Sequence, residues 1–214
     1  MSVSRESLLI RRVLIAVGLV FTLVTMAIVA ADLSARRTRR IAEKFLTEFT
    51  ALKIGESTFE DARMLADRFN GQAYPVNGSE TGSPPDLQYA FGFENTWLHR
   101  LHIAVPTILL ANVTVGNGRV TGRGFRYGSV TPSRDSEFGV SDGRGEGPPF
   151  EIRHYRGRGY WMIYLTPAAS PEQRRLAYAL NLECLSKLGG CKLKQELLPA
   201  LWQNLRSLGG YTEM

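Results

Sequence analysis

The stretch TILLANVTVGNGRVTGRGFRYG, residues 107–128, decides the fold because it contains two β-strand patterns and the turn between them. Apolar and β-branched residues lie on both sides of Asn117-Gly118. Asn-Gly is the pair that favours a two-residue type I′ turn between antiparallel strands. Gly122 and Gly124 indicate a bulge or a sharp coil in the second strand. The stretch therefore predicts an antiparallel hairpin.

Strand patterns continue on both sides of this hairpin. LQYAFGFE, residues 87–94, alternates large apolar with small or polar side chains, as a half-buried strand does. FEIRHY and GYWMIYLTP, residues 150–155 and 159–167, predict a second hairpin, and the apolar content of both faces of the latter favours a central strand. Residues 128–149 show no periodicity and are rich in Gly, Ser and Pro, which predicts a long flexible loop, either disordered or involved in binding.

Helical patterns flank the predicted sheet. In residues 52–71, Ser57 and Glu60 form an S-x-x-E capping box at the start of a helix that ends at Asn70-Gly71. Ser170 caps a second helix, whose apolar residues recur every four positions up to Gly189-Gly190. Those positions are Leu176, Leu180, Cys184 and Leu188, and a shorter helix follows from about Leu193, restarting at Pro199. We therefore predict an α+β fold with helices at both ends of an antiparallel β-meander of about four to six strands.

An uncharged apolar segment, VLIAVGLVFTLVTMAIVAA, occupies residues 13–31. A helix of this length matches a bilayer core of about 30 Å. We predict an N-terminal transmembrane anchor over residues 13–33, after a short tail over residues 1–12. The alternative is a cleaved signal peptide, because Val29-Ala30-Ala31 has the small side chains that signal peptidase requires.

A basic cluster follows the apolar segment, inside a juxtamembrane helix predicted over residues 34–53. The helix has an apolar stripe at Ile41, Phe45, Phe49 and Leu52. Its basic residues, predicted to lie at the membrane surface where they can contact anionic lipid, are Arg36, Arg37, Arg39 and Arg40. Counted by the positive-inside rule, these arginines favour a cytoplasmic C-terminal part. A short tail before one apolar helix is, in contrast, the usual arrangement of a signal anchor that exports the C-terminal part of the chain.

The chain has two cysteines, Cys184 and Cys191, in the stretch CLSKLGGC. Their spacing is not the C-x-x-C of redox and zinc sites. Gly189-Gly190 is expected to turn the chain back toward the preceding helix, which brings Cys191 near Cys184. We predict a disulfide, the alternative being two reduced core thiols. Because disulfides persist in oxidising compartments, this favours an extracytoplasmic domain despite the arginine count.

The net charge of +6 lies mostly around the apolar segment, since residues 41–214 carry only +1. A nearly neutral domain is a poor match for phosphate backbones, so no nucleic-acid partner is expected. Two stretches that interleave arginine with aromatic residues, 122–128 and 154–161, are interpreted as glycine-rich hairpins with exposed arginines.

No motif predicts a catalytic, cofactor or metal site. His99 and His102 are three residues apart without an intervening Glu, which indicates structural or surface histidines rather than a zinc pair. No G-x-S-x-G elbow occurs, and KIGEST, residues 53–58, lacks the glycine framework of a P-loop. An enzyme remains an alternative: a hydrolase or transferase with its site near residues 128–149.

Residues 52–71, with a glycine-serine turn followed by a short helix that ends in glycine, resemble the start of small outer-membrane assembly proteins of the SmpA/OmlA type. The resemblance implies a small antiparallel sheet after the helix and an envelope scaffold role rather than catalysis. It covers about 20 residues, and the lipid-bearing cysteine of that family is missing. Pilin-like proteins share the outline of apolar helix, stalk, sheet and C-terminal disulfide, but the prepilin cleavage pattern is missing here.

We therefore expect a single-pass, membrane-anchored protein whose extracytoplasmic domain covers residues 54–214. Its expected partners are the lipid bilayer and a protein of the cell envelope, which it binds as a non-enzymatic module or scaffold. The alternatives are the hydrolase or transferase and a pilin-like assembly component.

Overall fold

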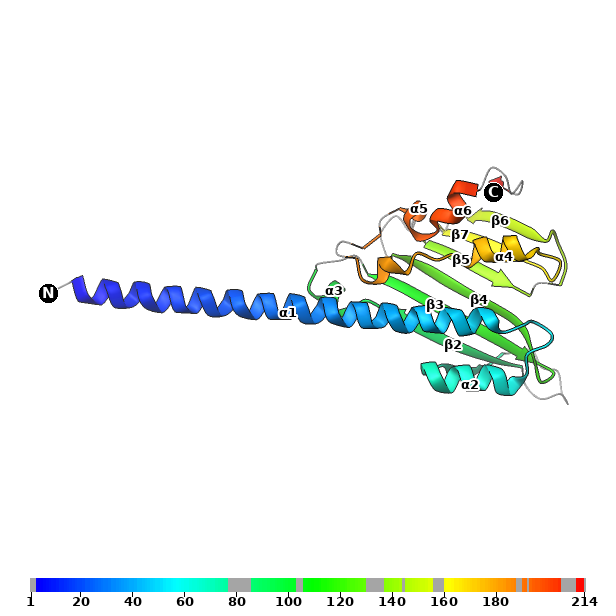
Figure 1. Cartoon of the computed structure of the whole chain (residues 1–214), viewed down its shortest axis with the longest axis horizontal. Coiled ribbons are helices and arrows are strands. Elements are labelled where there is room, and N and C mark those ends of the chain that lie inside the picture. Colours follow the sequence, from blue (N-terminus) through cyan, green and yellow to red (C-terminus); the bar gives the residue numbers. More distant parts are fainter. Residues whose placement is uncertain are drawn as a thin grey trace.

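A computed structural model describes residues 3–76, 86–102, 106–129, 137–143, 145–155, 160–187, 190–191, 193–204 and 211–213. It consists of one long helix, a mixed sheet and several short helices (Figure 1), which confirms the predicted α+β class. The helices are α1 (Val3–Ala51), α2 (Phe59–Phe69), α3 (Thr96–Arg100), α4 (Pro171–Ala177), the 3₁₀ helix η2 (Leu182–Leu185), α5 (Lys194–Leu197) and α6 (Pro199–Asn204). The strands are β1 (Gln72–Pro75), β2 (Leu87–Glu94), β3 (Thr107–Gly116), β4 (Arg119–Ser129), β5 (Glu137–Asp142), β6 (Phe150–Tyr155), β7 (Tyr160–Leu165) and β8 (Tyr211–Glu213).

The eight strands form one sheet in the order β1-β2-β3-β4-β5-β7-β6-β8, which is more strands than the sequence suggested. Pairing is antiparallel except between β5 and β7 and between β6 and β8. The prediction of one long loop over residues 128–149 is wrong, because β5 lies within it. In β5 the large side chains of Phe138 and Val140 point into the core, while the alternate positions are Gly139 and Ser141, which resemble loop residues.

The β3–β4 hairpin is as predicted. Asn117 and Gly118 both have positive φ, 53° and 74°, which is the requirement of a type I′ turn. The register shifts between Thr114 and Val115, so that Thr114 faces Gly122 and Val115 faces Val120. This bulge lies next to the glycine that predicted it.

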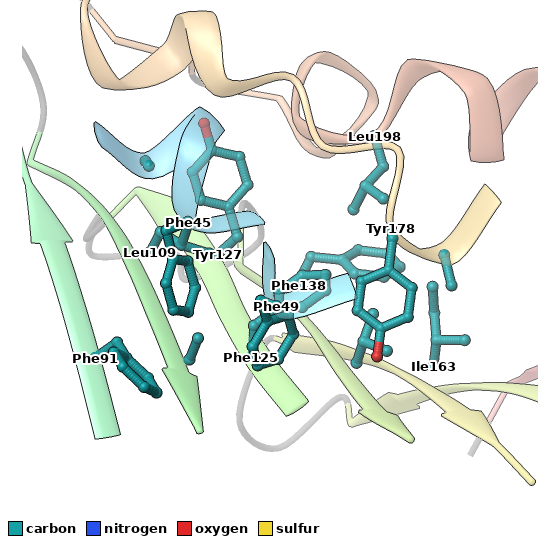
Figure 2. Close-up of a cluster of buried hydrophobic side chains, with 14 of the residues drawn as sticks. Phe45, Phe49, Phe91, Leu109, Phe125, Tyr127, Phe138, Ile163, Tyr178 and Leu198 are labelled. Atoms are coloured by element: carbon teal, nitrogen blue, oxygen red, sulfur yellow. The ribbon is translucent and has the colours of Figure 1, made fainter. Parts of the chain in front are cut away.

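The core lies on one face of the sheet, where the second half of α1 crosses the strands (Figures 1 and 2). The Phe45 ring lies 4.7 Å from that of Phe91 and 4.9 Å from that of Phe93. Burying each such ring stabilises the fold by about 1.5–3 kcal/mol. The helix predicted over residues 34–53 is thus a core element continuous with the apolar segment rather than a separate stalk. Ala42, not the predicted Ile41, occupies the buried position of its stripe.

The caps of the short helices explain where they start. At α2 the prediction was wrong by one residue, because Thr58 is the N-cap and exchanges hydrogen bonds with Asp61. The Ser57 hydroxyl instead accepts from the Lys53 amide at 2.9 Å. At α4 the predicted box is confirmed, with Ser170 and Gln173 capping each other.

The helix predicted from Ser170 to Leu188 is shorter than expected, since α4 ends at Ala177. Tertiary hydrogen bonds at Asn181 replace the helical ones: its amide donates to the Leu197 carbonyl at 2.8 Å, and its carbonyl accepts from the Tyr127 hydroxyl at 2.7 Å. Cys184 consequently lies in the short η2 helix. The restart at Pro199 is confirmed by the α5–α6 boundary.

Candidate functional site

The structure joins Cys184 and Cys191 in a disulfide, with the Cα atoms 5.2 Å apart. Both residues are buried in the main core. The carbonyl of Cys191 accepts a 2.6 Å hydrogen bond from the Ser129 hydroxyl at the end of β4. The disulfide therefore joins η2 to the segment before α5, the Ser129 hydrogen bond holds that segment to β4, and the sulfur atoms are buried.

The four predicted membrane-surface arginines separate into two groups. Arg39 is half-buried and pairs with Glu43 at 2.7 Å and with Glu183 of η2 at 3.5 Å, so it belongs to the domain. The others, Arg36, Arg37 and Arg40, are exposed. Arg36 pairs with Asp32 at 2.8 Å, immediately after the apolar segment.

A buried arginine that the sequence analysis did not single out holds α1 to the sheet. The Arg123 guanidinium, whose side chain is 7% exposed, donates to the carbonyls of Phe49 at 3.0 Å and Thr50 at 2.8 Å. The last carbonyls of a helix have no partner within the helix, and a cation there also interacts favourably with the helix dipole. Arg123 therefore caps the C-terminus of α1 from β4.

The charge of Arg123 is balanced by Asp142, whose side chain is fully buried. Its Oδ2 accepts from Arg123 Nε at 3.1 Å and from the Tyr178 hydroxyl at 3.2 Å, while Arg174 Nη1 lies 2.5 Å from both carboxylate oxygens. Burial raises the pKa of the Tyr178 hydroxyl above its ordinary value. The carboxylate of Asp142 is thus fully engaged in a structural network.

The opposite face of the sheet carries a groove of about 720 Å³. The helices α1, α2, α4, α5 and α6, with η2, all contribute to the core on the inner face. Along β4 and β5 the inner positions are large, as with Phe125 and Phe138, whereas the outer ones include Gly122, Gly124 and Gly139. Gly122 and Gly124 of β4 therefore form part of the floor of the groove, whereas Gly139 of β5 is covered by Met162.

Internal packing explains some of these glycines but not all. A Cβ on Gly124 would lie 2.7 Å from the Val140 carbonyl oxygen, and one on Gly139 would overlap the Met162 sulfur. A Cβ on Gly122 would have no neighbour nearer than 3.4 Å, and one on Gly92 none nearer than 3.6 Å. Glycine weakens a strand interior and often marks a place where a ligand or another chain approaches closely.

Apolar and aromatic side chains form the walls of the groove. Leu110, on β3, is 48% exposed, and Met162 and Tyr164 line the β7 side. The Tyr164 hydroxyl hydrogen-bonds that of Tyr155 at 2.7 Å, and the Tyr155 ring stacks on Tyr160. Burial, with the Tyr155 hydrogen bond adding to it, raises the pKa of Tyr164 to about 12.

The charged groups beside the groove are paired. Arg126 forms an ion pair with Glu137 of the neighbouring strand, and Arg153 pairs with Glu151 at 2.6 Å. The Arg126 and Arg153 guanidinium groups lie 5.6 Å and 5.1 Å from the ring centroids of Tyr160 and Tyr164. On the side of β6 and β7, the outer face therefore presents paired charges and tyrosine rings.

His99 lies on α3 and His102 lies just after it, and the centroids of their rings are 6.5 Å apart. Within the described residues, no three His, Cys, Asp or Glu side chains lie close enough to hold a metal ion. The arginine-aromatic stretch at 122–128 is part of β4, and the middle of the stretch at 154–161 lies outside the described residues.

These features define an α+β domain with an open, glycine-floored sheet face, carried on one helix that is long and apolar enough to cross a membrane. Comparison with protein-family models, with curated proteins and with solved structures found no match for the chain.

Proposed function

We propose that the protein is a single-span membrane module whose domain faces an extracytoplasmic space and binds an apolar segment of a protein partner in the groove on the outer face of the sheet. The observation that carries the proposal is the groove floor at Gly122, where an added Cβ would lie no nearer than 3.4 Å to a neighbouring atom. Gly122 lies beside the bulge between Thr114 and Val115, and a binding surface gives a further reason for glycine at this position.

The proposed anchoring is supported by α1. Its apolar part has a mean hydropathy of 2.8 over 18 residues and is not buried by the domain. Large apolar side chains from Ile10 to Leu33 stand in solvent, which is costly in water and favourable in lipid. The Cys184–Cys191 disulfide supports an oxidising compartment and hence export of the domain.

The chemistry of the groove supports a protein partner over a charged ligand. The charged groups beside the groove form ion pairs and so do not complement an acidic polymer. The leucine, methionine and tyrosine side chains that line the groove are of types that are common at protein interfaces. The one carboxylate residue of the groove lining, Asp142, directs its side chain into the structural network with Arg123 and Arg174, which favours binding over hydrolysis. The envelope scaffold role implied by the resemblance of residues 52–71 agrees with this proposal.

Site-specific photo-crosslinking tests the proposal in cells that express the full chain. A photoreactive residue at Asn112 in the groove is expected to give a discrete adduct with a protein, which a Gly122→Val substitution in the same chain abolishes. The same photoreactive residue at Met64, 57% exposed on α2, is the matched control and is expected to give no such adduct. Adducts that persist after Gly122→Val, or that form equally from Met64, contradict a partner in the groove.

A further inference from the structure

The short helix α3 lies at the level where the apolar part of α1 ends (Figure 1). Its Leu98 is fully buried and forms a separate small cluster with Ala31 and Ala35 of α1. Alanines one turn apart allow this close approach. Along a helix the two alanines span only about 6 Å, which fixes the height of α3 on α1 closely.

The charged residues that follow the apolar segment of α1 indicate where α3 would lie relative to the bilayer. The uncharged segment ends at Asp32, and the exposed Arg36 and Arg37 follow. A bilayer has an interfacial layer of about 5–8 Å on each side of its hydrocarbon core. With α1 across the membrane, Ala31 and Ala35 lie in this layer, and Leu98 brings α3 into it.

The exposed side chains of α3, and of Leu101 directly after it, have the chemistry of that layer. Trp97 is 55% exposed and Leu101 is 39% exposed, although both are apolar. The Arg100 guanidinium lies 5.4 Å from the centroid of the Trp97 ring. Tryptophan concentrates at membrane interfaces, and basic residues beside it attract anionic headgroups.

The position of α3 is fixed by the sheet as well as by α1. The buried Asn95, which precedes α3, accepts a 2.9 Å hydrogen bond from the amide of Thr107 at the start of β3. A displacement of α3 would therefore move the start of β3 with it.

We infer that α3 is a second membrane contact: Trp97 and Leu101 insert into the headgroup layer of the bilayer that α1 crosses and seat the domain directly on the membrane. The occupant of this surface is phospholipid. The inference rests on the proposed anchoring by α1. It adds that the domain is held at a fixed height above the lipid rather than free on a flexible stalk.

Fluorescence quenching in proteoliposomes tests this with the full chain. Trp161 is buried and Trp202 packs against it, which leaves Trp97 as the exposed tryptophan of the sequence's three. Phospholipid brominated near the headgroup is expected to quench the wild-type protein more than phospholipid brominated deep in the acyl chain. Trp97→Phe is expected to lose this shallow quenching.

A matched control places tryptophan elsewhere on the domain. Phe69 at the end of α2 contacts Phe45, which lies about 15 Å farther along α1 than Ala35. Met64→Trp in the Trp97→Phe chain is therefore expected to show no quenching by either lipid. Equal quenching of the wild type and Trp97→Phe, or quenching of Met64→Trp as strong as that of Trp97, overturns the inference.

Extraction of the same proteoliposomes with alkaline carbonate distinguishes the absence of the α3 contact from the absence of the α1 span. A chain that stays in the membrane but shows no quenching that depends on Trp97 contradicts the contact of α3 alone. A chain that is released contradicts the span of α1, and the α3 contact with it.

Discussion

At the scale of single residues, Arg123 and Asp142 decide how the long helix joins the sheet. The pair is buried and satisfies its hydrogen-bonding groups with the end of α1, Arg174 and Tyr178. Removing one partner of a buried ion pair leaves an uncompensated charge, whose cost exceeds what the intact pair contributes. The same residues in an exposed pair would matter little.

Asp142→Asn is accordingly expected to destabilise the domain by about 3 kcal/mol and to lower the thermal midpoint by roughly 6–12 °C. The matched control is Glu137→Gln, which removes the carboxylate of the surface pair with Arg126 on the same two strands and is expected to cost less than about 1 kcal/mol. Thermal unfolding of the full chain in detergent measures both. Equal losses from the two variants would mean that the buried network does not hold α1.

Three tyrosines make stability sensitive to high pH. Burial raises the pKa of Tyr127 and of Tyr178, and raises that of Tyr164 to about 12, from the ordinary value of 10.0. The unfolded chain therefore releases these protons first as the pH rises above 10.0, and the folded state loses stability over that range. Below 10.0 both states keep the protons and the contribution is constant.

The thermal midpoint is thus expected to fall steeply between about pH 10 and about pH 12. Tyr178→Phe removes one of the titrating groups, so the slope in this range is expected to become shallower than in the wild type. Tyr74→Phe, at a half-exposed tyrosine of β1, is the control and leaves the slope unchanged. A Tyr178→Phe chain with the wild-type slope would show that this hydroxyl does not set the alkaline limit.

At the scale of elements, the sequence predicted those strands and helices that have strong local signals. The Asn117-Gly118 turn, the Ser170 cap and the Pro199 restart are each specified by a few neighbouring residues. Strand β5 was missed because glycine and serine at its outer positions hide the alternation. The end of α4 was missed because it depends on hydrogen bonds from Asn181 to distant residues.

The groove could be predicted only in part. Gly124-Phe125-Arg126-Tyr127-Gly128 alternates large residues with smaller or polar ones, which indicates a strand whose two faces differ. That β5 lies beside this strand and lines the groove at Val140, Ser141 and Asp142 follows from a long-range pairing, which no local pattern specifies. The Arg123–Asp142 pair lies beyond local patterns for the same reason.

The two kinds of glycine in the groove are expected to respond differently to substitution. Gly122→Ala places its Cβ at ordinary van der Waals distance, 3.4 Å from the Asp142 carbonyl oxygen, and is expected to leave stability unchanged or raise it by about 0.5–1 kcal/mol. Gly124→Ala forces a Cβ to 2.7 Å from the Val140 oxygen and is expected to cost about 1–3 kcal/mol. Unfolding in denaturant measures both variants, and a loss at Gly122 as large as at Gly124 would mean that packing explains both glycines.

At the scale of the whole molecule, one half of α1 lies outside the domain and the other half packs in its core. The first half of α1 exposes only uncharged side chains between Val13 and Ala30, and the second half supplies Phe45 and Phe49 to the core. In the proposed membrane-anchored arrangement, a rigid connection of this kind would transmit the position of the membrane to the sheet. The sequence predicted a helix over residues 13–33 and another over residues 34–53, but not that the second is part of the domain.

The buried disulfide also changes how the compartment must be tested. Cys184 and Cys191 are bonded to each other and inaccessible, so a membrane-impermeant thiol reagent does not report on them in the folded protein. A cysteine introduced at an exposed position reports instead. Met64 on α2 and Leu110 in the groove are suitable because 57% and 48% of their side chains are exposed.

The most direct test of a partner-binding domain outside the cytoplasm is the rate at which an impermeant maleimide labels Met64→Cys and Leu110→Cys in intact cells. We expect Met64→Cys to react without lysis and Leu110→Cys to react several-fold more slowly, because the partner covers the groove. In the purified protein the two rates are expected to be similar. Equal rates in intact cells would contradict an occupied groove, and labelling of both positions only after lysis would contradict export of the domain.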